Sequence, residues 1–414
     1  MKVLHLNYHE KSGGAAIAAH RIHQALIKQN IESLMLVQNK TSNSDKVFCA
    51  DNLSDIFLDK INLYFQRKMN NINLNHNNYK VSRSYNLIPT FKLKHLKKIN
   101  PDIVNLHWVG NNFIDFKEIS LIDKPIVWTL HDMWPYCGSE HYSFENRYKI
   151  GYEERMTAKK KKYFGFDLDK IVWMKKKNFL SNKINFVPTS SWQERKISKS
   201  MLFKNSKIKK IFYPINFNDW KRIDKNQARR DLGLPQDKKI FLFISERIDN
   251  PMKGLKIIKE ILDKRKTKDF CLVILGRQNK ELFQSINFEF KFINQIHNNN
   301  ESLVKIYSCA DLLLAPSLLE SFGIVALEAA CCNLPSIVFS NTGFEDTIKH
   351  KINGYIAKNS DPVDFKNGIE WCLNEENYKL ISKDNRNLLQ NIFDESKIAK
   401  EYENFYRDLI YEKN

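Results

Sequence analysis

The sequence lacks the long apolar runs and glycine-rich motifs that mark several protein classes. No stretch approaches 18 uninterrupted apolar residues, so we expect no membrane-spanning helix. Residues 1–6 enter a strand-like pattern without the apolar region of a signal peptide, which makes the cytoplasm the expected location. Neither GxGxxG nor GxxxxGK(S/T) occurs, so the two common glycine-rich nucleotide motifs are missing.

Paired cysteines are missing too. The seven cysteines form no CxxC pair and are odd in number, and five fall in apolar segments, so we expect reduced core thiols. Asp167 and Asp169 form a nominal DxD motif, a metal-binding signature of another transferase fold, but they follow no buried strand. We expect neither a metal nor a cofactor.

The charge is strongly unbalanced. The 414 residues carry a formal net charge of +19, which favours an anionic partner: nucleic acid, acidic lipid headgroups or a phosphorylated substrate. Lysine is abundant along the whole chain, so a solvated basic surface explains much of the charge equally well. The length and the 43% of hydrophobic residues suffice for two hydrophobic cores.

Apolar patterns predict an α/β fold with parallel sheets. A strand at 3–6, a Ser-Gly-Gly loop, a helix and a strand at 33–37 form a βαβ unit. A second α/β set follows after prolines and asparagines interrupt the pattern. We therefore expect domains at 1–205 and 206–394, and a final helix in 395–414 that crosses back to the first domain.

Two segments have weaker patterns. Residues 40–100 are polar and asparagine-rich, which predicts an insertion or a mobile loop. Residues 353–356 contain an Asn-Gly pair, which predicts a hairpin-like turn.

One segment combines a buried strand, a tight turn and a helix start. The apolar run 311–315 ends in Pro-Ser, and an alanine-rich helix starts at Ile324. The first amides of such a helix, from Phe322 to Val325, lie at the positive end of its dipole and can hold a phosphate. Gly323 lets that ligand come close.

Two carboxylates flank this turn. Glu328 lies eight residues after Glu320, about 12 Å along a helix. One carboxylate can therefore face the far end of a ligand while the other faces its middle. Two acids around a phosphate site predict a sugar nucleotide as the ligand.

Two cations lie at another predicted strand-to-helix turn. Arg247 and Lys253 are six residues apart, after a strand at 239–245. Arginine offers phosphate a planar fork and lysine a point charge, so the pair suits a leaving diphosphate better than it suits an ordinary surface. Gly13 and Gly14 follow the first strand, where a turn or a ligand explains them equally well.

A histidine closes a predicted central strand. His131 ends the run 125–131, at the sheet edge where ligands of α/β enzymes bind. A lone histidine is usually structural, but Asp132, Trp134 and Tyr136 follow, a composition typical of a sugar-contacting loop. We expect this loop to contact the acceptor.

Residues 149–183 are basic and aromatic, with the run Lys-Lys-Lys-Lys-Tyr-Phe at 159–164. Such clusters suit an anionic membrane surface, with about 1 kcal/mol for each lysine near the headgroups. A solvated helix is the equal alternative.

Taken together, these motifs resemble one known family. The chain is similar, along nearly its whole length, to the retaining GT-B glycosyltransferases of glycosyltransferase family 4. The matching positions are first-loop glycines, a strand-closing histidine, a phosphate-binding pair and an E-x7-E motif: Gly13, Gly14, His131, Arg247, Lys253, Glu320 and Glu328. The Ser-Gly-Gly-Ala-Ala and Leu-His-Asp-Met-Trp-Pro stretches also resemble the bacterial members that build exopolysaccharide, capsule or lipopolysaccharide.

The resemblance implies a GT-B architecture, in which two Rossmann-like domains with parallel sheets face each other across an interdomain cleft. It implies transfer of a sugar from a nucleotide-sugar donor, with retention at the anomeric carbon and without a required metal. The acceptor would be a saccharide or a lipid-linked saccharide, met in the cytoplasm or peripherally at the inner membrane face.

The resemblance also implies roles in donor binding. Glu328 would hold the ribose hydroxyls, and Glu320, Phe322 and Gly323 would hold the donor sugar and its phosphate, with Ile324 beside them.

By the same resemblance, Arg247 and Lys253 would stabilise the leaving diphosphate, and His131 would contact the sugar near the reacting carbon. One departure concerns the residue before the arginine. Many members have glycine there, and this chain has Glu246, whose charge weakens diphosphate binding unless it turns away.

Two other functions remain open. The +19 charge alone suits a non-catalytic basic α/β protein that binds nucleic acid or another polyanion, although no RNP, zinc or helix-turn-helix pattern supports it and no nucleic-acid partner is expected. A phosphorylase of the same architecture is the second. The donor base would be contacted by variable loops near 276–278 and 294–296.

Overall fold

The computed structural model of the chain describes residues 1–49, 53–73, 81–153, 166–181, 183–277, 280–284, 286–293, 300–381, 383 and 385–413. The chain divides into two units. Unit 1 contains residues 1–214 and 395–414, and unit 2 contains residues 215–394. The sequence pattern predicts domain ends after residues 205 and 394.

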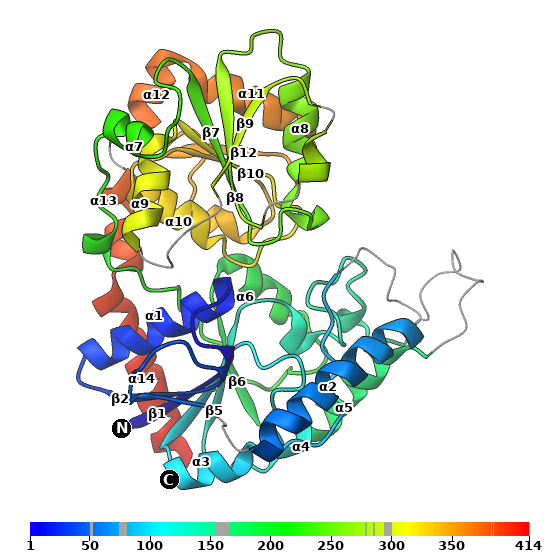
Figure 1. The fold of residues 1–414 in the computed structure, drawn as a ribbon. Coiled ribbons are helices and arrows are strands. Elements are labelled where there is room, and N and C mark those ends of the chain that lie inside the picture. Colours follow the sequence, from blue (N-terminus) through cyan, green and yellow to red (C-terminus); the bar gives the residue numbers. More distant parts are fainter. Residues whose placement is uncertain are drawn as a thin grey trace. The chain divides into compact units, whose positions relative to one another are not determined.

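Unit 1 is built on a parallel sheet in the order β3-β2-β1-β4-β5-β6. Its strands are β1 (Lys2–His9), β2 (Glu32–Asn39), β3 (Val47–Cys49), β4 (Ile103–Leu106), β5 (Ile126–Leu130) and β6 (Ile184–Pro188). Its helices, shown in Figure 1, are α1 (Gly14–Lys28), α2 (Leu53–Ile72), α3 (Leu93–Ile99), α4 (Phe116–Ser120), α5 (Leu168–Leu180), α6 (Ser191–Ile197) and α14 (Glu395–Lys413). The predicted βαβ start is confirmed, since β1, α1 and β2 follow one another and the two strands pair in parallel.

The last helix, α14, belongs to unit 1 and packs against α1 (Figure 1). Lys28 Nζ at the end of α1 lies 2.7 Å from a carboxylate oxygen of Glu395. The amide of Asn105 in β4 donates a 2.6 Å hydrogen bond to the hydroxyl of Tyr406 in α14. The helix is thus tied both to α1 and to the sheet of unit 1.

The expectation of a mobile loop over residues 40–100 was wrong where the structure describes this segment, because it contains β3, α2 and α3. Residues 50–52 and 74–80 lie outside the described residues. The buried side of α2 includes the polar residues Asn62, Gln66 and, just past its end, Asn73. Gln66 Oε1 accepts the backbone N–H of Tyr85 at 2.8 Å. The apolar periodicity that identifies most helices is therefore weak here, since amides take the place of aliphatic side chains.

Unit 2 repeats the architecture with a parallel sheet in the order β12-β11-β10-β7-β8-β9. Its strands are β7 (Lys239–Ile244), β8 (Phe270–Leu275), β9 (Glu289–Ile293), β10 (Leu312–Ala315), β11 (Ser336–Phe339) and β12 (Gly354–Ala357). Its helices are α7 (Lys225–Asp231), α8 (Leu255–Asp263), α9 (Asn300–Cys309), α10 (Ile324–Cys331), α11 (Pro362–Leu373), α12 (Glu375–Ile381) and α13 (Asn385–Phe393).

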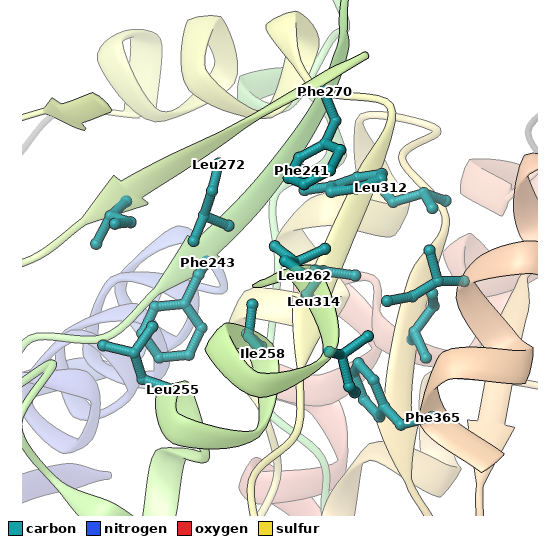
Figure 2. Packing of buried hydrophobic residues seen from close by; sticks show 14 of the residues in the cluster. Phe241, Phe243, Leu255, Ile258, Leu262, Phe270, Leu272, Leu312, Leu314 and Phe365 are labelled. Carbon is teal, nitrogen blue, oxygen red and sulfur yellow. The ribbon is translucent and has the colours of Figure 1, made fainter. Parts of the chain in front are cut away.

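Figure 2 shows part of the apolar core of unit 2. Leu255, Ile258 and Leu262 recur at helical spacing on α8 and are buried. They belong to one apolar cluster with Phe243 of β7 and Leu314 of β10. This packing holds the two central strands in place, so the loops that follow β7 and β10 start from fixed points.

The prediction of a hairpin-like turn at 353–356 was wrong, because β12 pairs there in parallel with β11. The chain turns earlier, where Lys351 has a φ of 62°. A Cβ at Gly354 would lie 2.2 Å from the carbonyl oxygen of Ser336, so the glycine permits close approach to the neighbouring strand. The Asn-Gly signal marks this contact and not a hairpin.

The strand order reverses at the same place in both sheets. Following the chain, each unit adds its first three strands toward one edge and its last three toward the other, so the first and fourth strands are neighbours. These neighbours are β1 and β4 in unit 1 and β7 and β10 in unit 2. Open α/β sheets bind ligands outside the carboxyl ends of such a strand pair.

Candidate functional site

The turn after β10 is shaped by close backbone packing. Gly323 has a φ of 85°, and a Cβ there would lie 2.1 Å from the ring of Phe344. The N–H of Gly343 donates a 2.8 Å hydrogen bond to the carbonyl of Glu320. A side chain at 323 would therefore both strain the backbone and displace the aromatic ring.

The turn after β7 packs directly onto the turn after β10. Gly254 has a φ of 75°, and a Cβ there would lie 2.1 Å from the carbonyl oxygen of Pro316. The N–H of Leu318 donates to the carbonyl of Met252 at 2.9 Å. The side chain of Asn250 accepts from the N–H of Met252 at 3.0 Å and fixes the start of this turn.

This packing brings together two residues that are far apart in the sequence. Lys253 Nζ lies 2.7 Å from Glu320 Oε2, and the hydroxyl of Ser317 lies 3.4 Å from the same oxygen. The side chains of Lys253 and Glu320 are 32% and 13% exposed, so the ion pair can be reached from solvent. An ammonium has three donors, and one carboxylate does not use them all. The pair can accept an anion beside it.

The second acid of the E-x7-E pair has different surroundings. Glu328 lies on α10 and is 5% exposed, and its Oε2 accepts a 2.8 Å hydrogen bond from the hydroxyl of Tyr307 on α9. A buried carboxylate with a hydroxyl donor is held in one orientation and suits hydrogen bonding to ligand hydroxyls. No pattern in the sequence pointed to Tyr307.

The other predicted cation, Arg247, extends into solvent. Its side chain is 63% exposed, and its guanidinium lies 3.5 Å from the carboxylate of Asp249. The carboxylate of Glu246 lies 3.6 Å from the guanidinium of Arg277. Glu246, at the position where the resemblance leads us to expect glycine, therefore lies beside a cation of its own.

At the carboxyl end of β1, the two predicted glycines differ. Gly13 caps α1 with a φ of 87°, a conformation that favours glycine. A Cβ at Gly14 would meet no atom within 4 Å. Gly14 is therefore not required by the fold of unit 1, and it leaves open space at the start of α1.

His131, directly after β5, has protein partners at both ring nitrogens. Its Nε2 lies 2.9 Å from Nδ1 of His107, and its Nδ1 lies 2.6 Å from the hydroxyl of Tyr213. Burial lowers the pKa of His131 to about 4. The ring is therefore neutral at pH 7.

Asp132 is the centre of a buried network. Its carboxylate lies 2.6 Å from His141 Nδ1 and accepts hydrogen bonds from Trp108 Nε1 at 3.1 Å and from the N–H of Trp134 at 2.9 Å. Burial opposes its charge, but His141 and these donors hold the pKa of Asp132 below its usual value. Ser84 Oγ lies 2.8 Å from His141 Nε2, so Ser84, His141 and Asp132 are arranged like a catalytic triad. Ser84 is fully buried, and this arrangement is therefore structural.

The other loop residues predicted to contact the acceptor are buried within unit 1. Trp134 donates from Nε1 to the carbonyl of Ser84 at 2.8 Å. The hydroxyl of Tyr136 donates to Gln193 Oε1 at 3.0 Å. Their polar atoms are thus used inside the unit, and contact with an acceptor stays a prediction.

The basic segment 149–183 is described only in part, because the lysine run at 159–162 lies outside the described residues. Within α5, Lys176 is buried and donates to the carbonyls of Trp134, Cys137 and Gly138. One lysine of this segment therefore stabilises the loop after β5.

The nominal DxD acids also have structural partners. Asp167 accepts from the N–H of Lys170 at the start of α5 and lies 2.5 Å from Arg147. Asp169 lies 3.3 Å from Arg83. In the part of the chain that the structure describes, no group of three His, Cys, Asp or Glu residues is placed to hold a metal ion.

The structure tests two further predictions only in part, the base-contacting loops and the absence of a membrane-spanning helix. Of the expected base-contacting loops, Gln278 and residues 294–296 lie outside the described residues. Across the described ranges, no helix is long and apolar enough to cross a membrane.

The loops that carry the Lys253–Glu320 pair lie in a segment with known relatives. Residues 224–391 match the family model "Glycosyl transferases group 1". "Uncharacterized glycosyltransferase MJ1607" of Methanocaldococcus jannaschii is 28% identical over 195 residues, 44% of this chain and 48% of that protein. "Glycogen synthase" of Finegoldia magna is 28% identical over 286 residues, 63% of this chain and 57% of that protein. The chain spans about half the length of these relatives.

Solved structures share the fold over both units. Sucrose-phosphate synthase from Thermosynechococcus elongatus matches with a TM-score of 0.71 and 17% identity over 99% of each chain. Anabaena Alr3699/HepE in complex with UDP-glucose matches with a TM-score of 0.67 and 16% identity, over 99% of this chain and all of that one. The predicted GT-B fold with two Rossmann-like domains is confirmed.

Proposed function

We propose that the protein is a glycosyltransferase that moves a sugar from a nucleotide-sugar donor to a saccharide or lipid-linked saccharide acceptor. The Lys253–Glu320 pair carries the proposal, because it lies at the carboxyl ends of β7 and β10 inside the segment that matches the group 1 glycosyltransferases. The UDP-glucose complex of HepE supports a donor of this class.

In this proposal, unit 2 holds the donor. Lys253 and Arg247 stabilise the charge of the leaving diphosphate, and the first amides of α10, at Ile324 and Val325, help to hold it. Glu320 binds the donor sugar next to Phe322 and Gly323.

The nucleoside end of the donor lies toward Glu328. Its carboxylate accepts the ribose hydroxyls, and Tyr307 orients it through the 2.8 Å hydrogen bond. By the resemblance, Gly13 and Gly14 contact the donor phosphates, and His131 lies near the reacting carbon.

The chemistry we propose is transfer with retention and without a metal ion. The bond between the anomeric carbon and the phosphate oxygen breaks, and the acceptor oxygen bonds to the same face of that carbon. The acceptor proton passes to the leaving phosphate. Arg247 and Lys253 compensate the charge that develops there, which is the contribution a metal makes in other transferases.

Transfer by variants tests this assignment. We expect Glu320→Gln, Lys253→Ala and Arg247→Ala each to lower kcat/KM at least 100-fold. Lys256→Ala is the matched control, since Lys256 is 90% exposed on α8 and pairs only with Glu260 at 3.8 Å in the described structure. Undiminished transfer by all three site variants would overturn the proposal.

We also propose a role in cell-surface polysaccharide synthesis, with unit 1 resting on an anionic membrane. Phe166, Ile171 and Met174 on and before α5 are 65%, 39% and 40% exposed. They line a groove of about 450 Å³ together with the cations Lys170 and Lys175 and the acids Glu153 and Asp167. Exposed apolar side chains beside lysines suit the headgroup region of an anionic bilayer.

Vesicle co-sedimentation at low ionic strength tests the membrane part separately. The wild type should sediment with vesicles that contain phosphatidylserine, and Met174→Glu should weaken this at least threefold. Leu380→Glu, at a 72% exposed position of unit 2, is the control and should bind like the wild type. Equal binding by Met174→Glu, or none by the wild type, would remove the membrane from the proposal.

A further inference from the structure

Three histidines of unit 1 form a continuous line of hydrogen bonds across neighbouring strands. His5 lies in β1, and His107 and His131 directly follow β4 and β5. His5 Nδ1 lies 2.8 Å from His107 Nε2, and His107 Nδ1 lies 2.9 Å from His131 Nε2. The line ends at the hydroxyl of Tyr213, 2.6 Å from His131 Nδ1. We call these four residues the imidazole array.

The contacts within the array allow only two arrangements of its hydrogens. Each neutral imidazole carries one N–H, and each short N···N contact needs one hydrogen between its two nitrogens. All three rings therefore carry the hydrogen on Nδ1, or all three carry it on Nε2.

The surroundings of His5 favour the arrangement in which the rings carry their hydrogen on Nδ1. His5 is fully buried, and within the described residues its Nε2 has no hydrogen-bond partner. In the Nε2 arrangement this atom would be an N–H donor without an acceptor. In the Nδ1 arrangement it is only a lone pair, and a buried donor without a partner is the rarer and costlier case.

The end at Tyr213 is compatible with the same choice. A hydroxyl oxygen can accept as well as donate, so Tyr213 can accept the hydrogen of His131 Nδ1 across the 2.6 Å contact.

We propose that His5, His107 and Tyr213 are positioning residues for the proposed sugar transfer, because they hold His131 neutral, with its hydrogen on Nδ1, at the end of β5. The proposal rests on the proposed function, which places His131 near the reacting carbon. Both nitrogens of the ring are used inside unit 1, so His131 gives no proton to the substrate and takes none.

The surrounding charges support a neutral array. His23 faces His5 with a ring-centroid distance of 5.9 Å, and a cation at either ring would repel a cation at the other. The one carboxylate next to His131 in sequence, Asp132, is already bound to His141, Trp108 and the N–H of Trp134. Burial, followed by the neighbouring histidines, lowers the pKa of His107 well below its usual value.

Nitrogen NMR on the full chain labelled with ¹⁵N-histidine tests the array without any ligand. Ring signals are assigned by single-histidine variants. We expect His131 to carry its hydrogen on Nδ1, with an unprotonated Nε2, from pH 8 down to pH 5. A hydrogen on Nε2, or titration of His131 near its ordinary pKa of about 6.5, would overturn the proposal.

A conservative variant tests the positioning role. Tyr213→Phe removes the acceptor of His131 and should lower kcat about 10- to 100-fold, while the affinity for a nucleoside diphosphate changes less than about twofold. The same variant should alter the His131 nitrogen signals. Tyr402→Phe is the control, since Tyr402 is another buried tyrosine of unit 1, 3.4 Å from Thr129 and outside the array.

The outcomes distinguish failure of the positioning role from failure of the proposed function. Unchanged kcat in Tyr213→Phe, or an equal loss in Tyr402→Phe, would overturn the positioning role. If the wild type binds no nucleoside diphosphate and transfers no sugar, the proposed function fails and the positioning role fails with it. The NMR result then still decides whether the array exists.

Discussion

At the scale of single residues, identical side chains have different surroundings and so different roles. Glu320 is partly open to solvent and paired with Lys253, whereas Glu328 is buried and bound by Tyr307. A general acid and base pair would need two carboxylates near one reacting bond. The two environments favour hydrogen bonding to different parts of one long ligand.

Because of this difference, the substitution of glutamine for glutamate should have unequal effects at positions 320 and 328. Glu320→Gln removes the charge that holds Lys253 and should lower kcat at least 100-fold with a small effect on diphosphate affinity. Glu328→Gln should weaken nucleoside diphosphate binding about tenfold, since it replaces one ribose acceptor by a donor, with a smaller effect on kcat. Steady-state kinetics with calorimetry separates the two, and the reverse pattern would contradict the assignment.

Two glycines provide a matched pair for stability. Gly323→Ala should lower the free energy of unfolding by about 2–4 kcal/mol, because the new Cβ would lie 2.1 Å from the Phe344 ring at a φ of 85°. Gly14→Ala should change it by less than about 1 kcal/mol, because a Cβ there meets open space. Urea unfolding measures both.

The Gly14→Ala variant also probes the donor site. If Gly14 faces the donor phosphates, Gly14→Ala raises the donor KM several-fold in a fully stable protein. An unchanged KM would remove Gly14 from the site, and a stability loss equal to that of Gly323→Ala would contradict the structural account.

At the scale of elements, the helices and strands with regularly spaced apolar residues were predictable from the sequence. The strands β1, β2, β5, β7 and β10 lie where their apolar runs place them. α2 was missed because amides such as Gln66 occupy its buried side. β12 was missed because its glycine serves close strand packing and resembles a turn signal.

The sequence predicted those residues of the candidate site that lie in loops after strand ends. Lys253, Glu320 and His131 all lie in loops that follow the carboxyl end of a strand, which sequence and fold rules can place. Their partners were not predictable, because Tyr307 and Tyr213 come from other elements and carry no local signal. The contact between Gly254 and Pro316 that brings Lys253 to Glu320 also depends on the folded sheet.

The loop after β5 provides a prediction at this scale. Lys176→Met should lower the free energy of unfolding by about 3 kcal/mol, because it leaves three buried carbonyls, including those of Cys137 and Gly138, without their donor. Lys175→Met, at the exposed neighbouring position, should have almost no effect. Equal effects in urea unfolding would show that the buried ammonium does not hold the loop.

At the scale of the whole molecule, the buried histidines of unit 1 make stability depend on pH. Burial lowers the pKa of His20 to about 4, of His23 to about 3 and of His131 to about 4. Below about pH 6.5 the unfolded chain binds protons that the folded unit does not, so stability falls as the pH falls from 6.5 toward 4.

Each such histidine contributes a slope of at most about 1.4 kcal/mol per pH unit. Urea unfolding of the full chain between pH 6.5 and pH 5 should show this contribution as a smaller pH dependence in His23→Gln than in the wild type. Glu140 contributes with the opposite sign, because burial raises its pKa to about 8, so the comparison of variant with wild type isolates the histidine. An equal pH dependence in His23→Gln and wild type would contradict the burial of His23 as a neutral group.

The central claim is that Lys253 and Glu320 form part of a nucleotide-sugar site, and calorimetric titration with a panel of nucleoside diphosphates tests it most directly. We expect one of them to bind the wild type and Lys256→Ala equally, and Lys253→Ala at least tenfold more weakly, a difference of at least about 1.4 kcal/mol. Binding of none of them, or equal binding by Lys253→Ala, would contradict the claim.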